Sequence, residues 1–390
     1  MAVTSSTSFA TSPDSGHPDP RTPSHGQPPS GKVAKSSSVG KVSKHILPAN
    51  REQYQNFVYD DRFLLGDFDD KSKFLQFLNV KLPESVPDVP STGEESFLDL
   101  ANEVAKFIKD LRDKQGEHYL SLYLAFFRTY DFPLDSRKGP TLMFQETINK
   151  SGHVTDTMCR PDITAAFEGH WKNGVVPLPF IRLAGESASK GKSPLDQLRQ
   201  AISYLHYLLL ARPDLYIAQG LLSDDGKVTF LFGIGGEGIR QFVVEWKDPD
   251  LNKLLYAFIY RLYEPGDFAD SLYTETKWDE ETTARYTIKI TYPEGTKECR
   301  DFYSIYARNP FAARTHVLSN PNFKVEGNDL TIFKDQFCHV KRRFKKITIL
   351  DEHVHKPERV SGVVVAAYGE KINSPLSEDR CKHRLGLGYS

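Results

Sequence analysis

Residues 328–336 read NDLTIFKDQ, and this stretch decides how the C-terminal part of the chain is interpreted. The apolar and β-branched run at 330–333 is typical of a strand. Lys334 follows it directly, and residues 339–355 continue as a basic amphipathic stretch. The order predicts a strand that carries a lysine, followed by a helix. A lysine in this position is also common as a solvated strand end.

The segments after this strand give the region a family resemblance. FKDQFCHVKRRFKKITILDEHVH (333–355) precedes VSGVVVAAYGEKI (360–372) and SPLSEDRCKHRLGLGYS (374–390). A KDQ strand, a helix ending in ILD, a GVV strand and an RLGL segment occur in this order in the fungal-type protein kinase domain family. Residues 315–390 resemble that family closely, and residues 160–246 do so more loosely.

The resemblance implies a kinase-like N-lobe over residues 282–390, with ATP and Mg²⁺ as cofactors. In kinases a strand lysine, here Lys334, holds the nucleotide phosphates and pairs with a glutamate of the next helix. Two features weigh against ATP binding. Lys346 stands where the glutamate belongs, and residues 307–317 contain no glycine to bring backbone N–H groups close to phosphate. Glu352 lies one turn further on and could replace the glutamate only if the helix register differs.

The sequence ends before the family's catalytic loop, so its catalytic and metal-binding residues have no positions here. Phosphoryl transfer depends on those groups. We therefore expect a fungal-type protein kinase domain-containing protein that is truncated, pseudokinase-like and unable to transfer phosphate by itself. The sequence does not distinguish a natural short protein from a truncated gene model.

Residues 151–265 predict an α/β module with a mixed sheet. Apolar runs bounded by turn residues indicate strands, and an apolar face of period 3.6 indicates each helix. The expected elements are a strand opened by Pro161-Asp162-Ile163, a strand at 180–186, a helix capped by Ser193 and Pro194, strands at 215–222, 228–234 and 239–246, and a helix at 248–263. This order resembles the restriction-endonuclease-like, or PD-(D/E)XK-like, core.

The endonuclease resemblance implies a candidate catalytic set. Asp162 and Glu186 would lie on neighbouring strands and share a divalent metal, and Gln197 would lie near them on the helix. The lysine of the motif is replaced by Ala188, with Lys190 nearby. One alternative function is therefore a divalent-metal-dependent nuclease, with nucleic acid as a partner only if this module is functional. If both carboxylates are ordinary turn residues, the chain is a non-catalytic binding or scaffold protein with an unknown protein partner.

The remaining regions carry fewer signals. Residues 1–50 are rich in Ser, Pro and Thr and predict a disordered tail, and the acidic residues 264–281 predict a linker. Residues 51–150 predict a helical N-terminal region, within which the aromatic-rich residues 119–134 fit either a strand or a buried helix. His353 and His355 could offer two imidazole ligands, but such a pair is usually a pair of surface histidines, so we expect no metal site. The whole chain is predicted to be α+β.

Composition restricts the environment of the protein. The 390 residues are 39% hydrophobic with a net charge of −1, so no overall field attracts nucleic acid or membrane. No apolar run is long enough for a membrane span. The cysteines are scattered without a C-x-x-C pair, which argues against a disulfide framework or a zinc knuckle. We expect an intracellular protein of the cytoplasm or nucleus.

Overall fold

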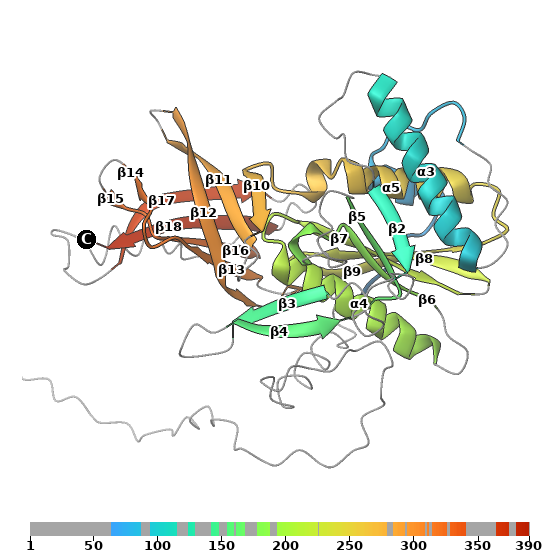
Figure 1. The fold of residues 1–390 in the computed structure, drawn as a ribbon, viewed down its shortest axis with the longest axis horizontal. Coiled ribbons are helices and arrows are strands. Elements are labelled where there is room, and N and C mark those ends of the chain that lie inside the picture. The colour runs from blue at the N-terminus through green and yellow to red at the C-terminus, as the bar shows by residue number, and fades with distance from the viewer. Residues whose placement is uncertain are drawn as a thin grey trace, which may run out of the picture. The chain divides into compact units, whose positions relative to one another are not determined.

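The computed structural model describes most of the chain after residue 63 (Figure 1). The described residues are 64–86, 94–114, 124–128, 142–147, 154–159, 161–167, 178–187, 193–224, 226–278, 284–292, 295–308, 310–311, 314–325, 328–340, 364–373 and 380–389. The predicted tail, the helix expected after Lys334, and Ala188, Lys190, Lys346, Glu352, His353 and His355 lie outside these residues. Within them the fold is mixed α+β, with two seven-stranded sheets.

The first sheet contains the strands predicted for the α/β module. Its order is β1 (Leu64–Asp67), β9 (Gly238–Glu245), β8 (Lys227–Ile234), β7 (Ile217–Ser223), β6 (Leu183–Ser187), β5 (Ile163–Phe167) and β2 (Leu124–Arg128). β6 and β7 are parallel and are joined through α4 (Pro194–Ala211), while β1 is parallel to β9. The other neighbours are antiparallel. The sheet is therefore mixed, as the sequence predicted.

Helices cover both faces of this sheet. Alternate residues of β8, namely Val228, Phe230 and Phe232, join one core cluster with α2 (Lys71–Leu78), α3 (Glu94–Lys114) and α5 (Leu251–Tyr263). Leu231 points the other way and joins the cluster beneath α4. This period of two places helices on both sides of the strand. At the start of α4, the Ser193 side chain accepts from the Asp196 N–H, which confirms the predicted cap.

The second sheet is antiparallel throughout. Its order is β10 (Tyr273–Trp278), β11 (Ala284–Tyr292), β12 (Gly295–Arg308), β13 (Thr315–Ser319), β16 (Ile332–His339), β18 (Arg380–Tyr389) and β17 (Val364–Asn373). Two further strand pairs are β3 (Leu142–Thr147) with β4 (Val154–Cys159), and β14 (Lys324–Val325) with β15 (Asn328–Asp329). Short 3₁₀ turns lie at η4 (Leu178–Phe180) and η5 (Gly266–Phe268). β16 contains Lys334 and the KDQ stretch at 334–336.

Two regional predictions were wrong in part. The region 51–150 supplies α2 and α3, but it also supplies β1, β2 and β3. β1 and β2 are the edge strands of the first sheet, and β2 lies in the stretch 119–134 that the sequence left open between strand and helix. Runs of four or five residues are too short for periodicity to separate strand from helix. The predicted linker 264–281 contains η5 and β10, and its Asp270 is only 5% exposed. Acidic residues there appeared solvated because their cationic partners lie more than 100 residues away.

A helix that crosses a bilayer must be both long and apolar. Among the described residues, none of the helices combines the length and the apolar character needed to cross a bilayer.

Candidate functional site

Glu186 lies on β6, and Asp162 immediately precedes the neighbouring strand β5. Ile163 of β5 is opposite Gly185 of β6 in an antiparallel pair, so the residue before β5, Asp162, comes opposite Glu186. The backbone N–H of Ser187 donates to Asp162 Oδ2 at 3.2 Å. The fold thus brings the two predicted carboxylates to one end of the β5–β6 pair.

The surroundings of Glu186 come from α4. Its side chain is fully buried, and Oε1 accepts from Gln200 Nε2 at 2.7 Å and from the Tyr204 hydroxyl at 2.5 Å. Gln197, the predicted helix glutamine, is buried one turn earlier on the same helix. Sequence reasoning missed Gln200 and Tyr204. Their four-residue spacing on an otherwise apolar face was the available signal.

This arrangement limits what the two carboxylates can do. Glu186 Oε1 already accepts two short hydrogen bonds, so a metal that bound this oxygen would compete with Gln200 and Tyr204. Glu186 is held by neutral donors, which suits a buried structural carboxylate as well as a metal ligand. Asp162, which is partly exposed, is the more accessible of the two.

Lys334, the candidate nucleotide ligand, lies in the interior of the second sheet. It is opposite Val317 of β13 on one side and Leu385 of β18 on the other, and its side chain is half-buried. Successive side chains of a strand point to opposite faces. Lys334 therefore lies on the face opposite that of Asp335.

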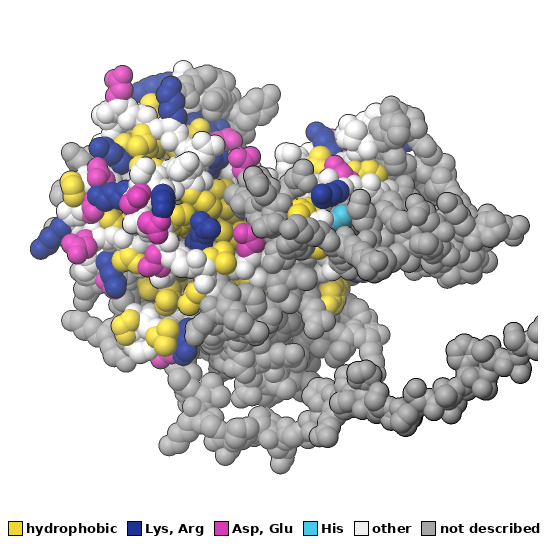
Figure 2. Space-filling model, turned by 180° about the vertical axis from the view of Figure 1, so that it is seen from behind, with side chains coloured by type: hydrophobic (Ala, Val, Ile, Leu, Met, Phe, Trp, Pro, Cys, Tyr) yellow, Lys and Arg dark blue, Asp and Glu magenta, His cyan; other side chains and the backbone are white. Residues whose placement is uncertain are grey.

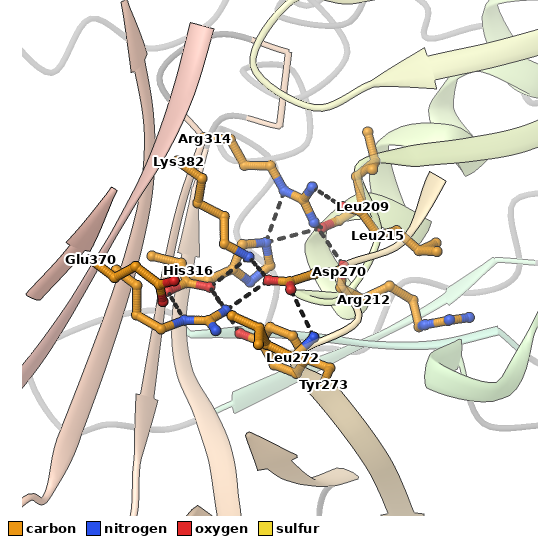
Figure 3. Close-up of polar contacts among 12 residues, drawn as sticks. Leu209, Arg212, Leu215, Asp270, Leu272, Tyr273, Arg314, His316, Glu370 and Lys382 are labelled. Carbon is orange, nitrogen blue, oxygen red and sulfur yellow. Dashed lines mark hydrogen bonds and ion pairs between the residues drawn. The ribbon is translucent and has the colours of Figure 1, made fainter. Parts of the chain in front are cut away.

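The face of Asp335 carries a buried cluster of four charges. Arg384 donates to Asp335 through Nε (2.9 Å) and to Asp270 through Nη2 (2.8 Å), and Lys382 Nζ lies 2.9 Å from Asp335 Oδ2 and contacts Asp270. The Tyr273 hydroxyl donates to Asp335 at 3.0 Å. All four charged side chains are at most 5% exposed. We call these four residues the charge cluster (Figure 3).

The charge cluster is internally neutral. Burial alone would raise the pKa of Asp335, but the charges of Arg384 and Lys382 and their hydrogen bonds hold it well below the usual range. Burial opposes ionisation of Arg384 too, and Asp335 more than offsets it, so the pKa of Arg384 is raised well above its usual value. Asp335 and Arg384 are therefore charged at neutral pH, and each is paired with an opposite charge, which satisfies the usual requirement for burying ions.

Next to the charge cluster, the second sheet contacts the C-terminal end of α4. Arg314 is fully buried, and its Nη2 donates to the carbonyls of Leu209 and Arg212, each at 2.7 Å (Figure 3). The Tyr286 hydroxyl donates to the Ala211 carbonyl at 2.6 Å. Burial lowers the pKa of Arg314 to about 10, so it remains cationic at neutral pH. A cation at a helix C-terminus is stabilised by the unpaired carbonyls and the helix dipole.

The turn between β12 and β13 completes this contact. Phe311 is 1% exposed and belongs to the core cluster beneath α4, and the Pro310 carbonyl accepts from the Gly236 N–H at 2.7 Å. Gly235 in the facing turn leaves room for Arg314, because a Cβ there would lie 2.6 Å from Arg314 Nη1. The glycine-rich run at 233–238 was the sequence signal for this contact.

Comparison with known proteins adds no family to these observations. Neither the protein-family models nor the curated proteins give a match to this chain.

Proposed function

We propose that this chain is a kinase-like protein of the fungal type in which residues 284–389 form the nucleotide-side lobe, and that these residues do not transfer phosphate by themselves. The observation that carries the proposal is the position of Lys334. Its strand lies between β13 and β18 in the order β12-β13-β16-β18-β17. A kinase lobe likewise places its lysine-bearing third strand between its second and fifth strands.

The turn before β13 supports the non-catalytic part of the proposal. In a kinase this position covers the phosphates with glycine backbone N–H groups. Here Phe311 is buried beneath α4 and the Pro310 carbonyl is hydrogen-bonded to Gly236. A turn that is fixed in this way cannot close over a triphosphate, and without glycine its backbone cannot approach phosphate closely.

Measurement of phosphate transfer and nucleotide binding tests the proposal. We expect no incorporation of labelled phosphate into a generic protein substrate, and no ATP·Mg²⁺-dependent rise in melting temperature. Lys334→Ala should leave both results unchanged, as should Lys371→Ala, an exposed control on β17. Incorporation that is lost in Lys334→Ala and retained in Lys371→Ala would overturn the non-catalytic assignment.

A gain-of-function variant tests the kinase-like part. Replacing residues 309–313 by a glycine-containing loop of equal length should release the turn and permit ATP·Mg²⁺ to raise the melting temperature. A ligand at 100 times its dissociation constant stabilises a protein by about 2.7 kcal/mol. We expect this shift to disappear when Lys334→Ala is added. A loop variant that folds and melts at the same temperature with and without ATP·Mg²⁺ would contradict a nucleotide-side lobe.

A second candidate function is a metal-dependent nuclease, which is favoured by the placement of Asp162 opposite Glu186 beside α4. The described surface gives little support to a nuclease function. On the face in Figure 2, basic and acidic side chains are interspersed rather than gathered into a basic patch. DNA cleavage with Mg²⁺ or Mn²⁺ that Asp162→Ala abolishes and Asp69→Ala retains would establish this function. Asp69 is the control because it is an exposed carboxylate that follows the edge strand β1, which three strands separate from β6.

A further inference from the structure

The face of the second sheet that carries Lys334 also brings together two cysteines and a histidine. Cys338 of β16 is directly opposite Cys381 of β18, and His383 lies two residues further along β18 on the same face. Cys338 and Cys381 are 6% and 0% exposed, and His383 is partly buried. Among the residues that the structure describes, no other group of three or more His, Cys, Asp or Glu side chains is close enough to hold one metal ion.

The distances between these three side chains suit a metal ion. Cys338 Sγ lies 3.9 Å from Cys381 Sγ, and Cys381 Sγ lies 3.4 Å from His383 Nε2. All three ligand atoms lie within 4.8 Å of one another. A tetrahedral zinc ion, with Zn–S of about 2.3 Å and Zn–N of about 2.0 Å, separates two sulfur ligands by about 3.8 Å and sulfur from nitrogen by about 3.5 Å. Two of the three separations thus already match those of zinc ligands, and the third is bounded by 4.8 Å.

We propose that Cys338, Cys381 and His383 form a binding site for a thiophilic divalent cation, namely Zn²⁺. Thiolate and imidazole are the ligands that zinc prefers, and three protein ligands leave a fourth position for water or an exchangeable group. On binding, the two thiols release two protons to solvent and the imidazole stays neutral. The loaded centre then has no net charge, because two thiolates balance Zn²⁺, which suits a buried position.

Strand register and the position of nearby charges explain why these three residues can bind one metal ion. The charge cluster occupies the opposite face of the same two strands, so its arginine and lysine do not point at the thiols. The remaining described cysteine with a placed side chain, Cys299, belongs to another core cluster, and burial raises its pKa to about 12. It therefore serves as a matched control thiol that lacks metal partners in the described structure. The proposed zinc site is independent of the proposed kinase-like function.

Zinc titration of the full chain tests the site. Protein is purified under reducing conditions, stripped with a chelator and titrated with Zn²⁺ against a chromophoric indicator. We expect one equivalent to bind. Cys338→Ser and Cys381→Ser should each weaken binding by at least about 100-fold, more than the loss typical of altering a group that only supports a ligand. Cys299→Ser should bind zinc as the unaltered chain does.

Cobalt supplies a readout that does not depend on the variants folding. The unaltered chain loaded with Co²⁺ should develop the thiolate charge-transfer band and the visible bands of four-coordinate cobalt. Each of three results would overturn the site: a cobalt spectrum without thiolate bands, zinc binding that survives in the double variant Cys338→Ser/Cys381→Ser, or a Cys338–Cys381 disulfide that persists in protein incubated with zinc and reductant.

Discussion

The two faces of the β16–β18 strand pair have opposite chemistry although their residues alternate along the same strands. One face carries Asp335 and Phe337 opposite Arg384 and Lys382, and it contacts the elements around α4 and β7. The other carries Lys334 and the three proposed zinc ligands. On the first face each charge of the cluster is paired with an opposite charge, so this face serves stability. The second face carries the proposed metal ligands.

The charge cluster should give the largest effect. Arg384→Ala leaves Asp335 and Asp270 buried with only Lys382 as a cationic partner, and breaking a buried ion pair costs about 3–5 kcal/mol. Urea denaturation measures this loss. Arg300→Ala removes an exposed ion pair with Glu298 and should change stability by at most about 1 kcal/mol. Equal losses in the two variants would mean that burial of the cluster contributes nothing.

Phe311→Ala should have the next largest effect, because it empties a buried position beneath α4. We expect a loss of about 3 kcal/mol, which is typical of removing a buried phenyl ring, together with faster amide exchange in β12 and β13. Tyr306→Ala is the control. Tyr306 lies on β12, the strand that leads into this turn, and it is 36% exposed. If exchange rises equally throughout the chain in Phe311→Ala, the turn has no specific role in holding the sheet.

Tyr273→Phe should cost about 1–2 kcal/mol, since it removes a hydrogen bond to a charged carboxylate and keeps the ring. Tyr303→Phe provides the comparison, because its ring contacts Arg285 and is only half-buried. Thermal unfolding of both variants measures the difference. An unchanged melting temperature in Tyr273→Phe would show that Arg384 and Lys382 alone satisfy Asp335.

Acid titration should give the smallest effect. It tests two buried histidines, one on α4 and one on the second sheet. Burial lowers the pKa of His206 to about 3, and burial together with Arg314 lowers that of His316 well below its usual value. Both are neutral when folded but take up a proton below about pH 6.5 when unfolded. Their contribution to stability is therefore complete above pH 6.5 and declines as pH falls, by about 1 kcal/mol each at pH 5.5.

Substitution of each histidine checks this assignment. Chemical denaturation of His206→Gln and His316→Gln between pH 7.5 and pH 5.5 should show a shallower decline than the unaltered chain. His206 lies on α4 and His316 lies on the second sheet beside Arg314. A decline that neither substitution reduces would assign the acid sensitivity to other groups.

Local sequence signals determined several elements of this protein. The Ser193 cap, the α4 and α5 periodicity and the Asp-Gly turn before β8 depend on residues a few positions apart, so the predicted helices and strands at 193–263 are confirmed. The strand at the KDQ stretch is confirmed for the same reason. The candidate pair of Asp162 and Glu186, by contrast, came from the resemblance to the endonuclease-like core.

Only the tertiary structure decided which distant residues meet. Asp335 and Arg384 are 49 residues apart, Asp270 and Lys382 are 112 apart, and Cys338 and Cys381 are 43 apart. Each pairing depends on strand register, and a shift of one residue would move every side chain to the other face. The scattered cysteines therefore argued against a metal site until the register of β16 and β18 placed two of them together. Spacing along the chain reports local structure, whereas ligand sets and buried ion pairs depend on non-local pairing.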